Sequence, residues 1–217
     1  KVPICRHPQF DGPGLREHSP ESKRDYSIFT DSLSGKSKTY PLTEFGKPQI
    51  VETMRQIPNC EQIDLIFASQ FLRTQQGAQA VSDEIENSTG RKVEIVVSPL
   101  LNPIWMPPDS LSEEEFCRLK QTGRTAVAEA MFQKWAGGLG ESPEMVEERI
   151  KTFLTYLRET TDKRSSTQPV VFTHASFASA MLRHVQGLDL TSPRNEEQIL
   201  KVAGYYFLVV NGDLLGV

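Results

Sequence analysis

The sequence predicts an α/β fold, a three-layer sandwich in which a mostly parallel central sheet is flanked by helices and ends in an antiparallel C-terminal edge. Two observations predict it. Short apolar runs, rich in β-branched or aromatic residues, alternate with amphipathic stretches long enough for helices. The last apolar run continues into Asn211-Gly212, a strong signal for a hairpin turn, so we expect the chain to fold back there.

The predicted strands are short runs at residues 2–6, 63–69, 93–97, 169–173 and 205–210. A length of 217 residues favours one domain over two, so we interpret residues 1–217 as a single domain. Polar or proline-rich stretches at about 11–40 and 98–111 are predicted to be long loop insertions. Both follow a predicted strand, and ligands in open α/β sheets bind outside the carboxyl ends of strands. These loops are therefore expected to border a binding site.

The clearest predicted helix begins with Ser142 as N-cap and Pro143 at the first helical position. Its apolar residues recur on one face: Val146, Ile150, Phe153, Leu154 and Leu157. A second helix is expected from about residue 71 to a stop at Gly90, and a third after Thr43, with its interior strained by Pro48. Further helices are expected at 112–135, with an interruption at Gly123, and at 177–185.

Composition argues against several classes of protein. With 38% hydrophobic and 24% charged residues, the chain has an ordinary globular composition. A net charge of -4 argues against a nucleic-acid partner. No stretch reaches the roughly 18 apolar residues of a membrane helix, which predicts no membrane partner and a cytoplasmic location. The chain begins at Lys1, so removal of a targeting segment before it stays open.

The cysteines, Cys5, Cys60 and Cys117, lie far apart and lack the spacing of a zinc site or a disulfide framework. We interpret them as reduced, small apolar residues. No cluster of histidine, cysteine or acidic residues has metal-ligand spacing either. We therefore expect neither a metal nor a cofactor.

Residues suited to phosphate follow three of the predicted strands. Arg6-His7 ends the first, Arg73 comes just after the second, and His174 follows the fourth. Parallel strands would bring these residues to one edge of the sheet, where the backbone N–H groups of a following helix also favour an anion. Guanidinium groups match phosphate oxygens, and a neutral imidazole can attack phosphorus without a metal. Together these residues predict a compact phosphate pocket.

Each of these residues has a simpler interpretation when taken alone. An Arg-His pair is more often found at the protein surface. An arginine placed like Arg73 is more often a solvent-exposed helix residue, and His174 could be a buried histidine that only makes structural hydrogen bonds. Their joint placement at strand ends is what favours the phosphate site. His18 and His184 lack that placement, so we interpret both as structural.

Four motifs, taken in order along nearly the whole chain, resemble those of the histidine phosphatase superfamily, which includes the phosphoglycerate mutases. Cys5-Arg6-His7 is similar to its Arg-His-Gly signature, and residues 41–46 to its Leu-Thr-x-x-Gly helix start. Residues 68–78 resemble its Ser-x-Leu-x-Arg-x-x-x-Thr-Ala block, and residues 172–177 its strand ending in Ser-His-Gly-Gly. Four matches in register are far more specific than any single one.

The resemblance implies a two-step transfer in which His7 attacks the phosphoryl group and water or an acceptor then attacks the phosphohistidine. Arg6, Arg73 and His174 would hold the phosphoryl oxygens, with the backbone at Ala175 as a further phosphate contact. Neither a metal nor another cofactor is implied. The expected partner is a small-molecule phosphate ester or a phosphorylated protein.

The chain departs from the family pattern at several positions. Pro8 and Ala175 stand where glycines are usual, and Pro13 falls near an asparagine of the mutases. The family's usual general acid is a glutamate after the third strand, and Asn102 stands nearest that position. Asn102 cannot donate a proton as an acid does, which leaves an enzyme with an unusual donor, for which Asp109 is our candidate, or one whose substrates have good leaving groups. The alternative donors, residues 113–115, are explained more simply as the first turn of a helix.

Three functional interpretations follow. The first is a metal-independent phosphatase acting on a small molecule or on a side chain such as phosphohistidine. The second is a phosphoglycerate-type mutase, and the third is a non-catalytic phosphate-binding or scaffold domain. Phe10, Trp105 and Met106 could form an apolar wall for substrate, although loop aromatics more often anchor packing.

Overall fold

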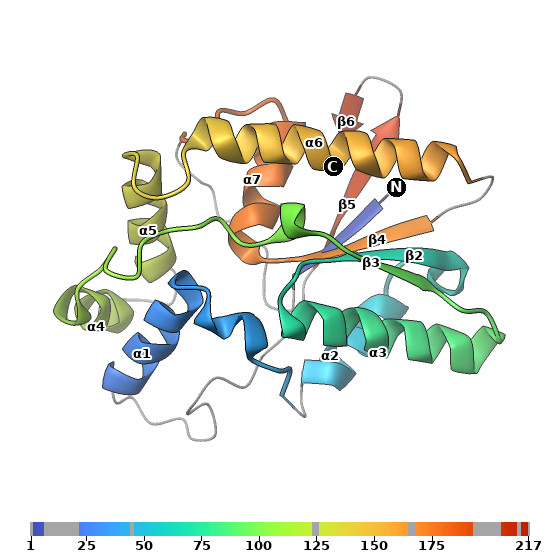
Figure 1. The fold of residues 1–217 in the computed structure, drawn as a ribbon, viewed down its shortest axis with the longest axis horizontal. Coiled ribbons are helices and arrows are strands. Elements are labelled where there is room, and N and C mark those ends of the chain that lie inside the picture. The colour runs from blue at the N-terminus through green and yellow to red at the C-terminus, as the bar shows by residue number, and fades with distance from the viewer. Residues whose placement is uncertain are drawn as a thin grey trace.

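The computed structural model describes residues 2–6, 22–43, 46–122, 126–164, 168–192, 205–211 and 214–216. Across these residues the strands form a 6-stranded sheet in the order β3-β2-β4-β1-β5-β6 (Figure 1). The strands are β1 (Val2–Arg6), β2 (Ile63–Ala68), β3 (Glu94–Val97), β4 (Gln168–Thr173), β5 (Tyr205–Asn211) and β6 (Leu214–Gly216). Each predicted strand is present, with an end that differs from the prediction by at most one residue.

The sheet confirms the predicted fold class. The strands β1, β4, β2 and β3 pair in parallel. At the other side β5 pairs antiparallel with β1, and β6 pairs antiparallel with β5, which gives the expected antiparallel C-terminal edge. The parallel pairing of β1, β2 and β4 brings their carboxyl ends to one edge of the sheet.

The described helices are α1 (Ser22–Leu33), α2 (Gly46–Arg55), α3 (Leu72–Thr89), α4 (Glu113–Thr122), α5 (Ala126–Ala136), α6 (Pro143–Asp162) and α7 (Ala175–Val185), with short 3-10 turns η1 (Lys36–Thr39), η2 (Cys60–Gln62) and η3 (Pro99–Leu101). Figure 1 shows α6 and α7 over one face of the sheet and α2 and α3 over the other. Helices α1, α4 and α5 lie beyond the carboxyl ends of the parallel strands. None of the helices described is long and apolar enough to cross a membrane.

The central strands are apolar on both sides because helices cover both faces. Successive side chains of a strand point to opposite faces, so Phe67 packs with Phe153 and Phe177 beneath α6 and α7. The neighbouring Ile66 packs instead with Ile50 and other apolar residues of α2 and α3. Two cores therefore hold β2 and β4 rigidly from both sides, and these are the strands whose ends carry the candidate site.

Helix ends follow the signals in the sequence. The Ser142 hydroxyl accepts a hydrogen bond from the N–H of Met145 at 3.3 Å, which makes Ser142 the N-cap of α6 as predicted. Gly90 has a φ of 73°, and its N–H bonds the carbonyl of Glu86, so it ends α3 in the left-handed conformation that glycine favours. The predicted helix at 112–135 is present as α4 and α5, while Gly123 lies outside the described residues.

Two expectations about the N-terminal half are wrong. Pro48 does not strain α2, because it is the third residue of that helix, where its missing N–H has no partner to lose. The segment at 11–40 is not simply a loop, because its described part contains α1 and η1. The rings of Tyr26 and Phe29 pack on Phe116 of α4, with centroids 5.6 Å and 4.9 Å apart, so tertiary packing stabilises a helix that its polar composition did not indicate.

Candidate functional site

The candidate site forms where β2 and β4 end side by side. Ser69 follows β2 and His174 follows β4, and the N–H of Ser69 donates to the carbonyl of Phe172 at 3.2 Å. This pairing brings the Ser69 hydroxyl to 2.8 Å from Nε2 of His174. Both side chains are buried, with exposed fractions of 0% and 3%. A histidine held in this way has one ring orientation, which is what a contact to a developing charge requires.

Ser69 is fixed by the start of α3. Its hydroxyl lies 2.7 Å from Oγ1 of Thr74 and accepts a hydrogen bond from the N–H of Phe71 at 3.3 Å. Oγ1 of Thr74 in turn donates to the carbonyl of Phe71 at 2.7 Å. The imidazole of His174 is therefore held through a short buried network anchored on the first turn of a helix, not by a flexible surface contact.

Arg73 lies against the other side of the imidazole. Its Nη2 is 3.3 Å from Nδ1 of His174, and its Nη1 donates to the Ser37 carbonyl in η1 at 2.8 Å. The guanidinium carbon lies 4.6 Å from the centre of the Phe71 ring, which also meets the His174 ring edge to face at 4.6 Å. The Arg73 side chain is only 2% exposed. Burial penalises its charge and lowers its pKa to about 9, so it remains a cation at neutral pH.

The structure thus brings together two of the predicted residues, Arg73 and His174. Arg6 ends β1, and its backbone pairs with Thr173, so the end of β1 lies directly beside the end of β4. The side chain of Arg6 and the whole of His7 lie outside the described residues. Ala175 is the first residue of α7, directly after His174, where the first N–H groups of a helix are available to an anion.

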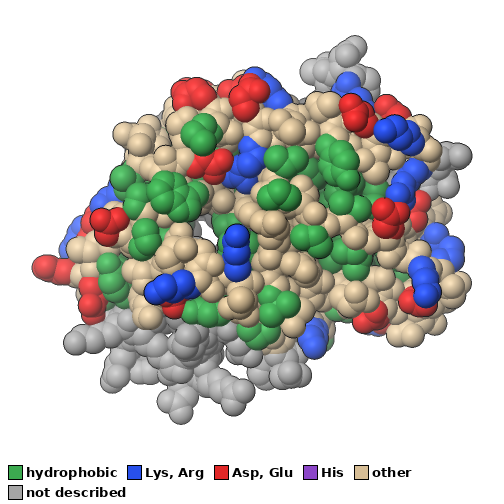
Figure 2. Space-filling view, viewed as in Figure 1, with side chains coloured by type: hydrophobic (Ala, Val, Ile, Leu, Met, Phe, Trp, Pro, Cys, Tyr) green, Lys and Arg blue, Asp and Glu red, His purple; other side chains and the backbone are tan. Residues whose placement is uncertain are grey.

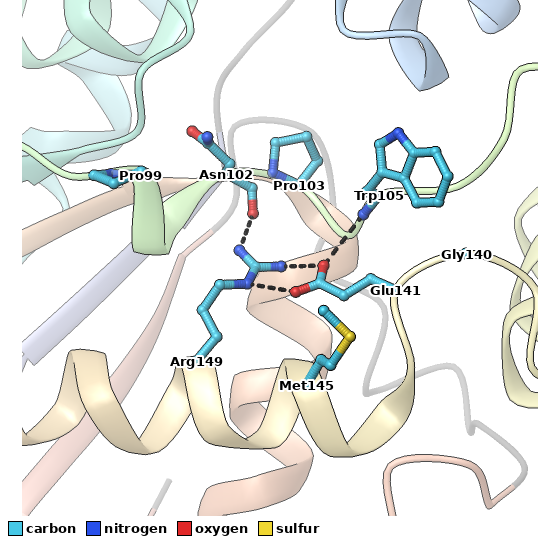
Figure 3. Close-up of a pocket in the computed structure, with 8 residues that line it drawn as sticks. All are labelled: Pro99, Asn102, Pro103, Trp105, Gly140, Glu141, Met145 and Arg149. Atoms are coloured by element: carbon cyan, nitrogen blue, oxygen red, sulfur yellow. Dashed lines mark hydrogen bonds and ion pairs between the residues drawn. The ribbon is translucent and has the colours of Figure 1, made fainter.

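A surface pocket of about 430 Å³ lies beside this site, between α6 and residues that follow η3 (Figure 3). It is lined by Pro99, Asn102, Pro103, Trp105, Gly140, Glu141, Met145 and Arg149. Trp105 and Met145 are 54% and 61% exposed. Figure 2 shows that on this face apolar side chains lie among charged side chains of both signs. The Arg149–Glu141 ion pair lies among these lining residues (Figure 3).

The expected apolar wall is only partly correct. Trp105 is exposed as expected, but Met106 is 5% exposed and belongs to the core beneath α6 and α7. Backbone direction explains this, because adjacent residues in an extended segment point to opposite sides. Phe10 lies outside the described residues. Within the part of the chain that the structure describes, no group of three His, Cys, Asp or Glu residues could hold a metal ion.

The comparisons with known proteins agree with this geometry. A sequence profile described as the histidine phosphatase superfamily (branch 1) matches residues 30–213, which is most of the chain. The chain belongs to the histidine phosphatase superfamily. A search of curated protein sequences finds no significant match. The predicted resemblance is therefore confirmed at the level of the superfamily.

Solved structures of low sequence identity share the fold of this chain. A mycobacterial glucosyl-3-phosphoglycerate phosphatase in complex with VO3 is 16% identical, with a TM-score of 0.63 over 100% of this chain and 97% of the other. An alpha-ribazole phosphatase from Shigella flexneri is 15% identical, with a TM-score of 0.61 over 99% and 92% of the two chains. YhfR from Bacillus stearothermophilus is also 15% identical, with a TM-score of 0.61 over 100% and 94%. At these identities the likeness shows the fold alone.

Asn102, which stands nearest the glutamate expected from the resemblance, makes hydrogen bonds through both halves of its side-chain amide. Its Oδ1 accepts from the backbone N–H of Gln70 at 3.1 Å, and its Nδ2 donates to the side-chain oxygen of Gln70 at 3.1 Å. Both halves of the amide are therefore used to hold the residue that follows Ser69. No local sequence pattern indicated this structural role for Asn102.

The candidate proton donors lie in different surroundings. Asp109 is exposed in a turn of the 98–111 segment, and its role stays a prediction. Glu113, Glu114 and Glu115 form the first turn of α4, as the simpler interpretation expected, and Glu115 pairs with Lys134 at 3.0 Å. A role in α4 explains these glutamates without any catalytic function.

Of the other two histidines, His184 is the one that the structure describes, and it lies away from the contacts given above. His184 lies in the last turn of α7, with Nδ1 3.9 Å from the Glu147 carboxylate. Desolvation by burial lowers the pKa of His184, so it is largely neutral at pH 7. His18 lies outside the described residues. Sequence reasoning missed Ser69, Thr74 and the Ser37 carbonyl as parts of the site, although Ser69 stands between a strand and a helix, the same signal that identified His174.

Proposed function

We propose that this chain is a metal-independent phosphatase that hydrolyses a phosphomonoester, or a phosphorylated side chain, through a phosphohistidine formed on His7. The observation that carries the proposal is the buried Arg73 guanidinium beside His174, at an edge where parallel strands end. A cation and an imidazole fixed against each other out of water suit a phosphoryl group, whose charge they would stabilise more strongly there than in water.

The proposed reaction has two steps. His7 attacks phosphorus in line, so that an N–P bond forms while the bond from phosphorus to the leaving oxygen breaks. Water then attacks the phosphohistidine, releases inorganic phosphate and restores His7. His7 directly follows Arg6, whose backbone pairs with the residue before His174, and this supports placing the nucleophile beside the imidazole. Nothing in this sequence of steps requires a metal.

The other groups would act on the phosphoryl oxygens. Arg6 and Arg73 would bind them as cations, and His174 would donate a hydrogen bond as charge develops in the transition state. The N–H of Ala175 at the start of α7 would add a neutral donor. Asp109 would supply the proton to the leaving oxygen, since Asn102 cannot.

Hydrolysis is favoured over transfer to a second substrate. The departures at Pro13 and Asn102 weaken the likeness to the mutases. The neighbour from mycobacteria is named as a phosphatase of glucosyl-3-phosphoglycerate, which supports a small phosphorylated substrate here as well. Because both helical layers pack on the one sheet, we also infer that residues 1–217 form a single domain.

The test is turnover of a panel of phosphate esters that includes sugar phosphates and phosphohistidine, with EDTA present throughout. We expect release of inorganic phosphate that survives chelation, and an acid-labile, alkali-stable label on rapid quenching. Activity that returns only with added Mg²⁺ or Zn²⁺ would rule out the mechanism. Label carried into a second organic product would identify a mutase. Tight phosphate binding without turnover of any ester would identify a binding domain.

A further inference from the structure

Residues 100–104, which we call the strap, contact residues that precede and follow His174 in the chain. The carbonyl of Leu101 accepts a hydrogen bond from Oγ1 of Thr173 at 2.7 Å. The N–H of Ile104 donates to Oγ of Ser176 at 3.2 Å. Thr173 ends β4 and Ser176 lies in the first turn of α7, so the strap spans the junction at which His174 leaves the sheet.

The strap also contacts the end of β2. Asn102 exchanges two hydrogen bonds of 3.1 Å with Gln70, one to its backbone and one to its side chain. Gln70 directly follows Ser69, whose hydroxyl holds Nε2 of His174 at 2.8 Å. A displacement of the strap would therefore shift the His174 ring in two ways, through the backbone next to His174 and through Ser69.

Arg149 of α6 binds the backbone of the strap (Figure 3). Its Nη1 donates to two strap carbonyls, that of Leu100 at 3.0 Å and that of Asn102 at 2.7 Å. Its Nε and Nη2 bind the two carboxylate oxygens of Glu141 at 2.8 Å and 2.7 Å. Its guanidinium carbon lies 4.3 Å from the centre of the Phe177 ring in α7. One side chain thus connects α6, the strap and α7.

The Arg149–Glu141 pair is itself held by burial and by hydrogen bonds to the surrounding backbone. Both side chains are largely buried, at 14% and 13% exposed. Glu141 and Trp105 exchange hydrogen bonds, because the N–H of Glu141 donates to the Trp105 carbonyl at 2.9 Å and the N–H of Trp105 donates to the Glu141 carboxylate at 3.3 Å. Gly140 permits this approach, since a Cβ there would meet the Trp105 carbonyl oxygen at 2.4 Å. These hydrogen bonds orient the Arg149 side chain and so fix the position of the strap carbonyls that it binds.

We propose that Arg149 is a positioning residue for the phosphatase reaction, acting through the strap on Ser69 and His174. The inference rests on the proposed function, in which His174 contacts the phosphoryl group. In the contacts described, Arg149 makes no hydrogen bond to Arg73 or His174, the described residues proposed to bind the phosphoryl group. Removal of the Arg149 side chain would change the orientation of the His174 ring. It would lower kcat more than it changes KM, because a misplaced donor loses most of its interaction energy in the transition state.

The central experiment compares Arg149→Lys with wild type. Lysine keeps the charge opposite Glu141 but cannot make the bidentate contact and bind both strap carbonyls at once. We expect kcat to fall by about tenfold to a hundredfold, with KM within about threefold of wild type. The control is Lys151→Gln on the same helix, whose ammonium pairs only with Glu147 and Glu148 at the surface in the contacts described. Its kcat should be unchanged.

A second measurement separates positioning from a general loss of structure. Thr173→Val removes the hydroxyl that binds the strap and keeps the side-chain shape, and it should lower kcat in the same way. If both residues act through the strap, the double variant loses less than the product of the two single losses. The ¹⁵N resonances of the His174 ring should shift in Arg149→Lys and stay in place in Lys151→Gln.

The outcomes distinguish this inference from the proposed function. A wild type that turns over no phosphate ester defeats the proposed function, while the ring resonances of His174 still report whether Arg149 positions it. A folded Arg149→Lys with wild-type kcat and unshifted resonances overturns the inference. Should that variant not fold, Thr173→Val decides it, since wild-type kcat and resonances there would show that the strap does not hold His174.

Discussion

Arg73 and Arg149 come from opposite faces of the sheet and reach the strand ends in very different surroundings. Arg149 binds a carboxylate through two parallel hydrogen bonds, so its charge is balanced within the protein. Arg73 donates to a backbone carbonyl, lies over the Phe71 ring and has its Nη2 3.3 Å from Nδ1 of His174. Burial correspondingly lowers the pKa of Arg73 to about 9.

The difference separates an arginine that holds structure from one that is suited to a ligand. A buried charge with a carboxylate partner stabilises what surrounds it, and removing it leaves the partner unpaired. A buried cation whose charge is disfavoured by its surroundings gains most when an anion arrives. Perturbed pKa values of this kind gather at functional sites, and Arg73 lies where the phosphoryl group is proposed to bind.

The largest expected effect is that of removing the proposed nucleophile, His7. His7→Ala should lower turnover by several orders of magnitude, because covalent catalysis cannot begin without the attacking imidazole. The acid-labile label should disappear, while circular dichroism should remain that of the wild type. Label found on a serine or a cysteine of the wild type would show that another residue is the nucleophile.

The next effect tests the proton donor. If Asp109 protonates the leaving oxygen, Asp109→Asn should lower the rate with alkyl phosphates by about 10²- to 10⁴-fold and leave p-nitrophenyl phosphate little changed. A good leaving group needs no proton, so the rate would come to depend steeply on leaving-group pKa. Glu113→Gln is the matched control from the first turn of α4. A rate profile unchanged by Asp109→Asn would exclude Asp109 as donor.

The comparison between the arginines predicts stability losses of different size. Arg73→Met should lower kcat/KM by about 10²- to 10³-fold, as loss of an electrostatic donor does. It should lower the free energy of unfolding less than Arg149→Met does, since desolvation already disfavours the charge of Arg73. Arg149→Met should lower that free energy by roughly 3 kcal/mol, because Glu141 is left largely buried without its partner.

Urea unfolding of the two methionine variants measures this contrast directly. Equal losses of stability would break the comparison, because Arg73 would then be a structural arginine like Arg149. A stable Arg73→Met with full activity would instead remove Arg73 from the site.

Sequence patterns predicted the sheet well and the site only in part. The strands were short apolar runs, and parallel pairing follows from the helices between them, so Arg73 and His174 were expected at one edge. The roles of Ser69, Asn102 and Arg149 could not be predicted in this way. Each depends on one contact between segments far apart in the chain, such as the 2.7 Å bond from Arg149 to the carbonyl of Asn102.

The helix α1 was missed for a similar reason. Its sequence is polar, and its stability comes from the packing of Tyr26 and Phe29 on α4, which no local pattern records. The Tyr26 hydroxyl also donates to the carbonyl of Leu111 at 2.7 Å, so the two stretches expected as separate loops meet each other. Local structural preferences apply to each stretch separately and could not predict this contact between them.

The smallest effect, and the most specific to Arg73, is a pH dependence of anion binding. Inorganic phosphate remains a dianion between pH 8 and about 10.5, so a change in its affinity over that range reports on the protein. The pKa of Arg73 is lowered to about 9, so the side chain is a cation below that pH and loses its proton above it. A bound anion favours the cation and raises this pKa, so binding is strongest below pH 9. The inhibition constant of phosphate should rise towards about tenfold per pH unit above pH 9. In Arg73→Met inhibition should be weak and flat across the range, which separates this titration from that of surface lysines. A wild-type inhibition constant that stays level up to pH 10.5 would mean that the charge of Arg73 does not hold the anion.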